Sequence, residues 1–441
     1  MLTILFDLRP TLRTPGFAQT AILALSLSLP LFAQSLTPAA AAPIFREGRE
    51  FALKDHSTLW GMSLEGPMRR VDPQSREVLA SGPDREGRLK ASEGLWSGML
   101  PKELNVANTA MEWAGVRWTM LVWPLGTDDA KERGVLLMHE LYHRIQPELH
   151  LFATGPDCGH LDTREGRIWL RLEFRALRAA LISQGEARRA SLGEALAFRA
   201  RRRSLFPEAA KSENSLELNE GLAEYTGVRL ALKPEEARAR TEARLDKADL
   251  GQAFMRSFCY VSGPALGLFL DEASPAWRKA VTVDSDLSTL LGSTWKLAPL
   301  EPSKVEEAAK RYGSEAVAGE EARRETRRAA HLRDLVRRFK EGPVLFAPMG
   351  NIEFNPNTQE SVQGLGIFNP NLRLVGPWGI LTVTGGCVLA SDWSHVRVEA
   401  PANPPVPPRA GPGWTLELKP GWTLAPGSRK GNWAIQPEVK P

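Results

Sequence analysis

The chain has 441 residues, which is long enough for two or three domains with a sizeable hydrophobic core. Hydrophobic residues account for 43% and charged residues for 24%, the composition of an ordinary soluble globular protein. The net charge of +4 is too small to indicate nucleic-acid binding without a concentrated basic patch, so we expect no nucleic acid as a partner.

The N-terminus predicts a secretory signal peptide. Arg9 and Arg13 precede an apolar stretch, residues 17–33, and small residues follow as far as Ala42. Pro30 and the modest length of the stretch argue against a permanent membrane span, and an uncleaved membrane anchor is the alternative. We therefore expect an exported protein, periplasmic or secreted, with no stable membrane span after cleavage.

Two segments before the centre of the chain predict β-structure. Residues 43–100 are mixed and polar, and their Gly, Pro and Asp residues predict short strands joined by turns. Residues 105–125 are enriched in Trp, Val and Thr and predict one or two strands that end at Pro124. An extended peptide could bind to the edge of such a strand by strand addition.

The stretch His139-Glu140-Leu-Tyr-His143 carries the strongest chemical signal. Two histidines four residues apart lie on one face of a helix, one turn from each other, so both imidazoles can reach one tetrahedral Zn²⁺. Glu140 between them is free to hold a water molecule and to act as general base. Asp128 or Asp129 is expected to cap this helix.

A catalytic zinc usually has three protein ligands and one position for water. His150 is one candidate for the third ligand, in the pattern His-Glu-x-x-His-x-x-Gly-x-x-His. The sequence departs from that pattern, because Gln146 replaces the glycine, Leu149 replaces the histidine and Pro147 interrupts the helix. We therefore expect His150 to be a structural or surface residue.

The stronger candidate lies in Asn219-Glu220-Gly-Leu-Ala-Glu224-Tyr225. Together with the first motif it resembles the gluzincin metallopeptidases, the clan that contains thermolysin and the zinc aminopeptidases. The resemblance covers these two short motifs and implies that Glu220 is the third zinc ligand. It also implies that Glu224 is the carboxylate behind a zinc histidine, and i, i+4 spacing puts both glutamates on one helix face. The sequence departs from the family at Arg144, where an uncharged residue is usual, and in the long interval between the motifs.

Tyr260-Val-Ser262-Gly263 resembles the Tyr-x-Lys-Gly segment of the zinc aminopeptidases, with Ser262 in place of the lysine. The resemblance implies that Tyr260 stabilises the tetrahedral oxyanion. A buried tyrosine in an apolar helix is the alternative. The cysteines Cys158, Cys259 and Cys387 have no ligand spacing, and we interpret them as buried thiols or as one disulfide with a free thiol.

Two arginine-rich helices are expected in the interval between the motifs, after about Asp162 and after about Glu186. They would form an insertion that covers the site. A basic face could bind nucleic acid or an anionic membrane, but no aromatic residues interleave with the arginines. We therefore expect a solvated face whose arginines pair with Glu165, Glu173 and Glu186.

We therefore expect an α+β protein with a zincin-like catalytic domain, an arginine-rich helical insertion and a small C-terminal β-rich domain. The expected function is an exported zinc metallopeptidase with one Zn²⁺ and a peptide or protein substrate. A zinc-dependent hydrolase of a non-peptide substrate and a cell-envelope protein with a structural zinc are the alternatives. The expected segments are 1–42 signal peptide, 43–100 strands and turns, 101–300 zincin-like domain, 301–342 charged helices, 343–400 β-rich domain and 401–441 loosely ordered Pro-rich tail.

Overall fold

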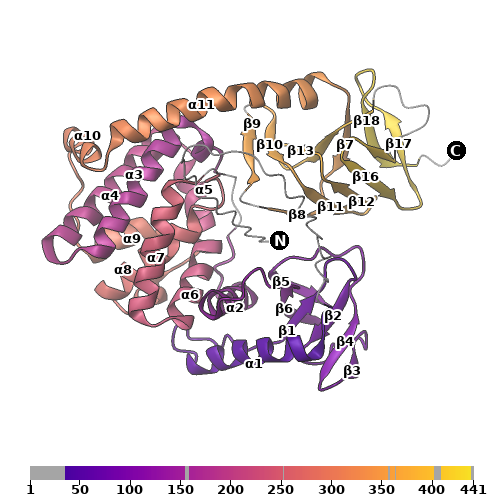
Figure 1. The fold of residues 1–441 in the computed structure, drawn as a ribbon, viewed down its shortest axis with the longest axis horizontal. Coiled ribbons are helices and arrows are strands. Elements are labelled where there is room, and N and C mark those ends of the chain that lie inside the picture. Colours follow the sequence, from indigo (N-terminus) through magenta and orange to yellow (C-terminus); the bar gives the residue numbers. More distant parts are fainter. Residues whose placement is uncertain are drawn as a thin grey trace, which may run out of the picture.

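The computed structural model describes residues 35–153, 158–251, 253–355, 358–362, 364–401 and 409–438. Figure 1 shows a sheet near the N-terminus, a helical part in the middle of the chain, and a β-rich part at the C-terminal end. The expected mixed α+β architecture with a C-terminal β-rich region is therefore confirmed. The apolar stretch of the predicted signal peptide lies outside the described residues. None of the described helices combines the length and the apolarity that crossing a membrane would require.

The first described element is helix α1 (Pro38–Lys54), capped by the Thr37 side chain. It corrects the expectation of strands and turns alone after residue 43, and it contains the last residues that we assigned to the signal peptide. Ala41 and Phe45 lie four residues apart and are buried against the main core, where α1 packs on α2 (Ala130–Ile145). Burial of this apolar face, which the polar composition of the region hides, explains the helix.

The N-terminal sheet has the strand order β3-β4-β2-β1-β6-β5, and only the β1–β6 pair is parallel. A two-residue turn with positive φ at Ala114 and Gly115 joins β5 to β6, as is usual in tight hairpins. The predicted strands in 105–125 are thus confirmed, and β5 forms the outer edge of the sheet. The strands are β1 (Met68–Val71), β2 (Glu77–Ala80), β3 (Lys90–Ser92), β4 (Leu95–Met99), β5 (Thr109–Trp113) and β6 (Val116–Val122).

In the helical part α6 packs against α2, and α8 packs against α6 and against the turn that precedes α6. The helix predicted to carry Glu220 and Glu224 is present but is divided by a π-helical turn, η2 (Glu217–Gly221). The other elements after α2 are η1 (Gly159–Asp162), α3 (Arg164–Ile182), α4 (Gly185–Leu205), α5 (Ala209–Leu216), α6 (Leu222–Ala231), α7 (Pro234–Asp249), α8 (Cys259–Ala273), η3 (Trp277–Ala280), α9 (Leu287–Thr294), α10 (Pro302–Arg311), α11 (Ser314–Val336) and η4 (Arg337–Glu341).

The predicted solvated face of the arginine-rich helices is wrong. Arg199 and Arg202 on α4 are 1% and 0% exposed and form ion pairs with carboxylates, among them Glu173 of α3. The helices α3 and α4 pack on each other, so these arginines face the contact between helices and not the solvent. On α3, Arg167 and Arg171 are also buried and pair with acidic residues of α7 and α11. The charged helices predicted over 301–342 are present as α10 and α11.

The C-terminal part contains a seven-stranded sheet, β17-β18-β7-β14-β13-β10-β9, and a five-stranded sheet, β15-β16-β12-β11-β8. Residues 409–438 complete both sheets, which corrects the expectation of a loosely ordered tail over 401–441. The tail strands bury Trp414, Leu424 and Ile435 in the core of this part, and proline content concealed that alternation. The strands are β7 (Val344–Pro348), β8 (Asn351–Phe354), β9 (Glu360–Val362), β10 (Gly366–Asn369), β11 (Leu372–Gly376), β12 (Gly379–Val383), β13 (Cys387–Leu389), β14 (His395–Glu399), β15 (Ala410–Gly411), β16 (Trp414–Leu418), β17 (Trp422–Pro426) and β18 (Trp433–Pro437).

Candidate metal centre

Three of the predicted site residues converge at the crossing of two helices. The Nε2 atoms of His139 and His143 lie 3.1 Å apart, and Glu220 Oε2 lies 3.6 Å from the first and 3.4 Å from the second. Two ligand atoms each about 2.1 Å from a tetrahedral zinc lie about 3.4 Å from each other. The three donor atoms therefore have the spacing of ligands around one metal ion, and the group could hold one.

Glycines allow the helices that carry these residues to approach closely. A Cβ atom at Gly227 of α6 would lie 2.4 Å from the carbonyl oxygen of Val135 on α2. Similarly, a Cβ atom at Gly263 of α8 would lie 2.4 Å from the Cα atom of Gly221. Real side chains do not tolerate such distances. Glycine at both crossings thus brings α6 to the histidine helix and brings Tyr260 on α8 to Glu220.

The π-helical turn determines which glutamates face the histidines. Glu217 and Glu224 are seven residues apart and would share one face of a regular α-helix. The wider turn between them separates the two, because Glu224 faces α2 while Glu217 is bound by Arg199 and by the hydroxyl of Ser262. Glu220 lies within this turn. Turns of this kind occur frequently at functional sites.

Each imidazole is oriented by a hydrogen bond at its other nitrogen. His139 Nδ1 lies 3.0 Å from Glu224 Oε2, and the other oxygen of Glu224 accepts a hydrogen bond from Arg240. His143 Nδ1 lies 2.9 Å from Gln146 Oε1. A protonated Nδ1 in each ring leaves Nε2 as the metal donor. Glu224 therefore lies where the sequence predicts a carboxylate behind a zinc histidine.

Sequence reasoning missed Gln146, which it noted only as a departure from another metalloprotease pattern. The side chain of Gln146 is fully buried, and its amide donates hydrogen bonds to the carbonyl oxygens of Leu151, Leu218 and Asn219. It thereby connects His143 to the backbone immediately before Glu220. The spacing of three residues from His143 on a helix was the available signal.

Glu140 lies in the same site, and its side chain is almost completely buried. Its Oε2 atom accepts no hydrogen bond from any of the described residues. Burial raises the pKa of Glu140, although His139 and His143 act in the opposite direction. An ionisable carboxylate with a free acceptor beside three metal donors is suited to exchanging a proton with a water molecule.

The electrostatics of the group favour a cation. Burial disfavours the charged form of His139, but the neighbouring carboxylates of Glu220 and Glu224 outweigh burial and raise the pKa of His139 to about 10. Burial would raise the pKa of Glu220, yet the two histidines hold it well below its usual range. The carboxylates that favour a proton on the imidazoles also favour a metal ion there.

Tyr260 lies at the site, but its hydroxyl is already bonded to another side chain and is not free to donate a hydrogen bond to an oxyanion. Its ring stacks on His139 with centroids 5.7 Å apart, and its hydroxyl donates a hydrogen bond of 2.8 Å to Glu220 Oε2. Burial and the nearby Glu220 carboxylate raise the pKa of Tyr260 well above its usual value, so the hydroxyl remains a donor. His150, by contrast, is exposed and lies outside the metal-donor group, as expected.

The donor group opens into a cavity of about 640 Å³. His139, Glu140 and Tyr260 form part of its wall, β5 forms another part, and β8 of the C-terminal sheet contributes residues 351–354. A cavity of this size falls within the range of ligand-binding sites. The three cysteines are buried free thiols and none of them belongs to the metal-donor group, which confirms the prediction of buried thiols.

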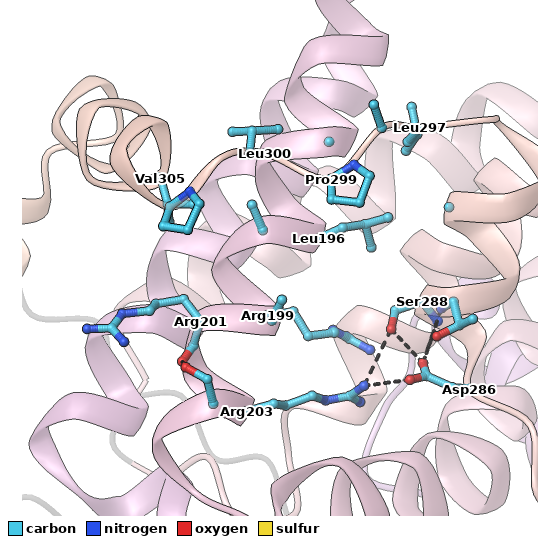
Figure 2. Close-up of a pocket in the computed structure, with 18 of the residues that line it drawn as sticks. Leu196, Arg199, Arg201, Arg203, Asp286, Ser288, Leu297, Pro299, Leu300 and Val305 are labelled. Atoms are coloured by element: carbon cyan, nitrogen blue, oxygen red, sulfur yellow. Dashed lines mark hydrogen bonds and ion pairs between the residues drawn. The ribbon is translucent and has the colours of Figure 1, made fainter.

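A larger cavity of about 940 Å³ lies between α4, α9 and the segment before α10 (Figure 2). Its wall includes Leu196, Leu300 and Val305, while Arg203 is held by Asp286. None of the described residues in its wall is a histidine, a cysteine or a predicted site residue. This cavity therefore shares no residue with the metal-donor group.

Comparison of the chain with protein-family models, with curated proteins and with solved structures finds no match.

Proposed function

We propose that this chain is an exported zinc metallopeptidase of the gluzincin type, with a zincin-like catalytic domain. The observation that carries the proposal is the convergence of His139 Nε2, His143 Nε2 and Glu220 Oε2 within 3.1 to 3.6 Å, beside the buried Glu140 carboxylate. The resemblance of the two motifs to the gluzincins supports the same assignment, as does the carboxylate of Glu224 behind His139.

In this proposal His139, His143 and Glu220 hold one Zn²⁺, and Glu224 and Gln146 fix the two imidazoles. When bound, zinc acidifies a water molecule and polarises a carbonyl group. Glu140 takes a proton from the attacking water and returns it to the leaving amine. The Tyr260 hydroxyl donates its hydrogen bond to Glu220 Oε2 in this structure, and it would have to turn from Glu220 to the developing oxyanion to stabilise it.

A polypeptide substrate is favoured by the edge of β5, which lines the cavity next to the donor group. An outer strand presents unpaired backbone N–H and C=O groups, to which an extended peptide can bind by strand addition. A small substrate without a peptide backbone would leave the N–H and C=O groups of this edge without hydrogen-bond partners. The cavity thus favours a peptidase over a hydrolase of another bond.

A purely structural zinc is disfavoured by the donor set. Closed structural sites commonly have four protein ligands, often cysteines. Among the described residues the donor group contains two histidines and one glutamate, and it borders a cavity. This composition leaves one coordination position to a water molecule.

The direct experiment measures zinc content and peptide cleavage for the wild type, for His139→Ala and for His150→Ala as a matched histidine control. We expect one zinc per chain and cleavage of a mixed peptide library by the wild type and the control. His139→Ala should lose both. Full zinc content in His139→Ala would show that the site is elsewhere, and stoichiometric zinc without any cleavage by the wild type would contradict the peptidase assignment.

A further inference from the structure

The cavity at the metal-donor group is bordered by the edges of two different sheets. β5 is the outer strand of the N-terminal sheet, and β8 is the outer strand of the five-stranded C-terminal sheet. Within the described part of the chain each pairs on one side only, β5 with β6 and β8 with β11. Both strands contribute residues to the wall of the same cavity.

Specific contacts fix β8 in this position. Glu353 of β8 accepts a hydrogen bond of 3.1 Å from the backbone N–H of Val106, shortly before β5. Arg373 lies opposite Glu353 on the neighbouring strand β11, and it donates a hydrogen bond of 2.6 Å to Asn105 Oδ1. The two sheets are therefore joined directly beside the cavity.

The segment before the tyrosine helix forms a second junction. Met255 is 1% exposed and packs in the core of the C-terminal part, although it belongs to the chain segment that precedes α8. The guanidinium of Arg256 lies 5.6 Å from the ring centroid of Phe354 on β8. The C-terminal part is thus anchored on both sides of the metal-donor group.

We propose that the C-terminal β-rich region forms the second wall of the substrate cleft, and that the substrate is an extended polypeptide segment held between β5 and β8. This inference rests on the proposed peptidase function. Successive N–H groups of an extended chain point to opposite sides, so a chain between two edges can satisfy its backbone groups on both.

The charges at the cavity favour internal cleavage of a chain over removal of a terminal residue. A free α-amino group would need an unpaired carboxylate as its partner. Of the carboxylates at the cavity, Glu140 and Glu220 belong to the proposed catalytic group. Glu112 on β5 is paired with Arg117, and Glu353 on β8 accepts the Val106 N–H. Ile352 and Phe354 of β8, together with the 55% exposed side chain of Phe152, offer apolar contacts to substrate side chains instead.

The first test needs no turnover. Zinc-loaded Glu140→Gln is incubated with a degenerate library of end-blocked peptides of about twelve residues, longer than either edge strand, and backbone hydrogen exchange is measured. We expect slower exchange in both 109–113 and 351–354. Protection of 109–113 alone, or of neither segment, would overturn the two-edge cleft whether or not the wild type cleaves peptides.

The second test uses the best-cleaved peptide and the wild-type full chain. Single N-methylations along that peptide should raise KM at consecutive residues, because alternate N–H groups face alternate edges. If N-methylation raised KM only at every second residue, a single edge would bind the substrate. The inference of a two-edge cleft would then fail, while the peptidase assignment would survive. If both strands were protected from exchange but the wild type cleaved no peptide, the two-edge cleft would survive and the peptidase assignment would fail.

A pair of variants tests β8 itself. Ile352→Ala should raise KM for the end-blocked peptide about 3–10-fold, as expected for loss of part of one apolar contact, with kcat little changed. Thr382→Ala, an exposed position of the same sheet on β12, should behave as the wild type. Equal KM values for Ile352→Ala and Thr382→Ala would contradict the role of β8, as would preference for peptides with a free N-terminus.

Discussion

Two buried clusters of charged side chains border adjacent turns of the helical run α5–η2–α6, and their carboxylates are matched differently, by permanently charged arginines in the first and largely by titratable imidazoles in the second. In the first, three arginines face three glutamates: Arg199, Arg202 and Arg203 with Glu173, Glu213 and Glu217. The second is the metal-donor group and its neighbours, in which three glutamates face two histidines and one arginine: Glu140, Glu220 and Glu224 with His139, His143 and Arg240.

The difference separates a structural role from a chemical one. Glu217 belongs to the matched cluster and Glu220, three residues later in the same π-helical turn, to the metal-donor group. Matched charges with complete hydrogen bonding hold a fixed arrangement of helices. In the second cluster two of the basic partners are imidazoles, which can exchange a proton for a metal ion, and the free acceptor at Glu140 leaves a group for proton transfer.

The largest effect is expected from breaking the matched cluster. Arg199→Met removes the arginine partner of Glu217 and one of the two arginine partners of Glu173, and the unpaired buried charge should lower the free energy of unfolding by about 3–5 kcal/mol. Urea unfolding measures this loss, and zinc affinity should fall too because Glu217 anchors the turn that carries Glu220. Arg201→Met, at an exposed position of the same helix, should cost less than about 1 kcal/mol. Equal losses of unfolding free energy in Arg199→Met and Arg201→Met would contradict the structural role of the buried cluster.

The second-largest loss of stability is expected from a substitution at the close crossing of α8 and the π-helical turn. Gly263→Ala places a Cβ atom 2.4 Å from Gly221 Cα, and we expect a loss of about 1–3 kcal/mol in unfolding free energy together with weaker zinc binding. Gly193→Ala is the matched control, because its Cβ would meet only Leu300 at an ordinary 3.6 Å. If Gly263→Ala bound zinc and unfolded like Gly193→Ala, the close crossing would not position the site.

Gln146 offers a finer test of how the metal-donor group is oriented. Gln146→Leu removes the acceptor for His143 Nδ1–H and should weaken zinc binding about 10–100-fold. Gln146→Glu keeps an acceptor oxygen and should restore most of that affinity, measured by competition with a chelator. The same affinity in the leucine and glutamate variants would assign Gln146 a packing role only.

The smallest effect concerns acid stability at the border of the matched cluster. Burial alone would raise the pKa of Asp286, but Arg203 outweighs it and lowers the pKa from 3.8 to about 2. Such a carboxylate stabilises the folded state above pH 3.8, and its contribution disappears as the pH falls through about 2. Asp286→Asn should therefore cost about 2 kcal/mol at pH 7 and progressively less below pH 3.8. Asp284→Asn, at an exposed position of the same loop, should leave the free energy of unfolding at pH 7 nearly unchanged.

The sequence predicted the parts of this arrangement that depend on local spacing. The pair His139/His143 lies within one α-helix, so periodicity was enough to align it, and the i, i+4 spacing also brought Glu220 and Glu224 to the same site across the junction of η2 and α6. The strand that became β5 and the cap at Asp129 were likewise local features.

Features that depend on tertiary packing could not be predicted in the same way. The arginines of α3 and α4 look solvated in sequence, and only the packing of the helices buries them. The π-helical turn has no periodic signature, and the role of Gln146 requires the approach of Leu218 and Asn219 from a distant segment. The strands of the Pro-rich tail form because both C-terminal sheets are present to pair with them.

The most direct measurement of the central claim compares zinc content and peptide cleavage in the wild type and in Glu140→Gln. The amide keeps the shape of the side chain but cannot accept the proton of the attacking water. We predict equal zinc content, one ion per chain, and cleavage reduced by about 10²–10⁴-fold in the variant. Cleavage by Glu140→Gln at the wild-type rate, with zinc bound in both, would contradict the account.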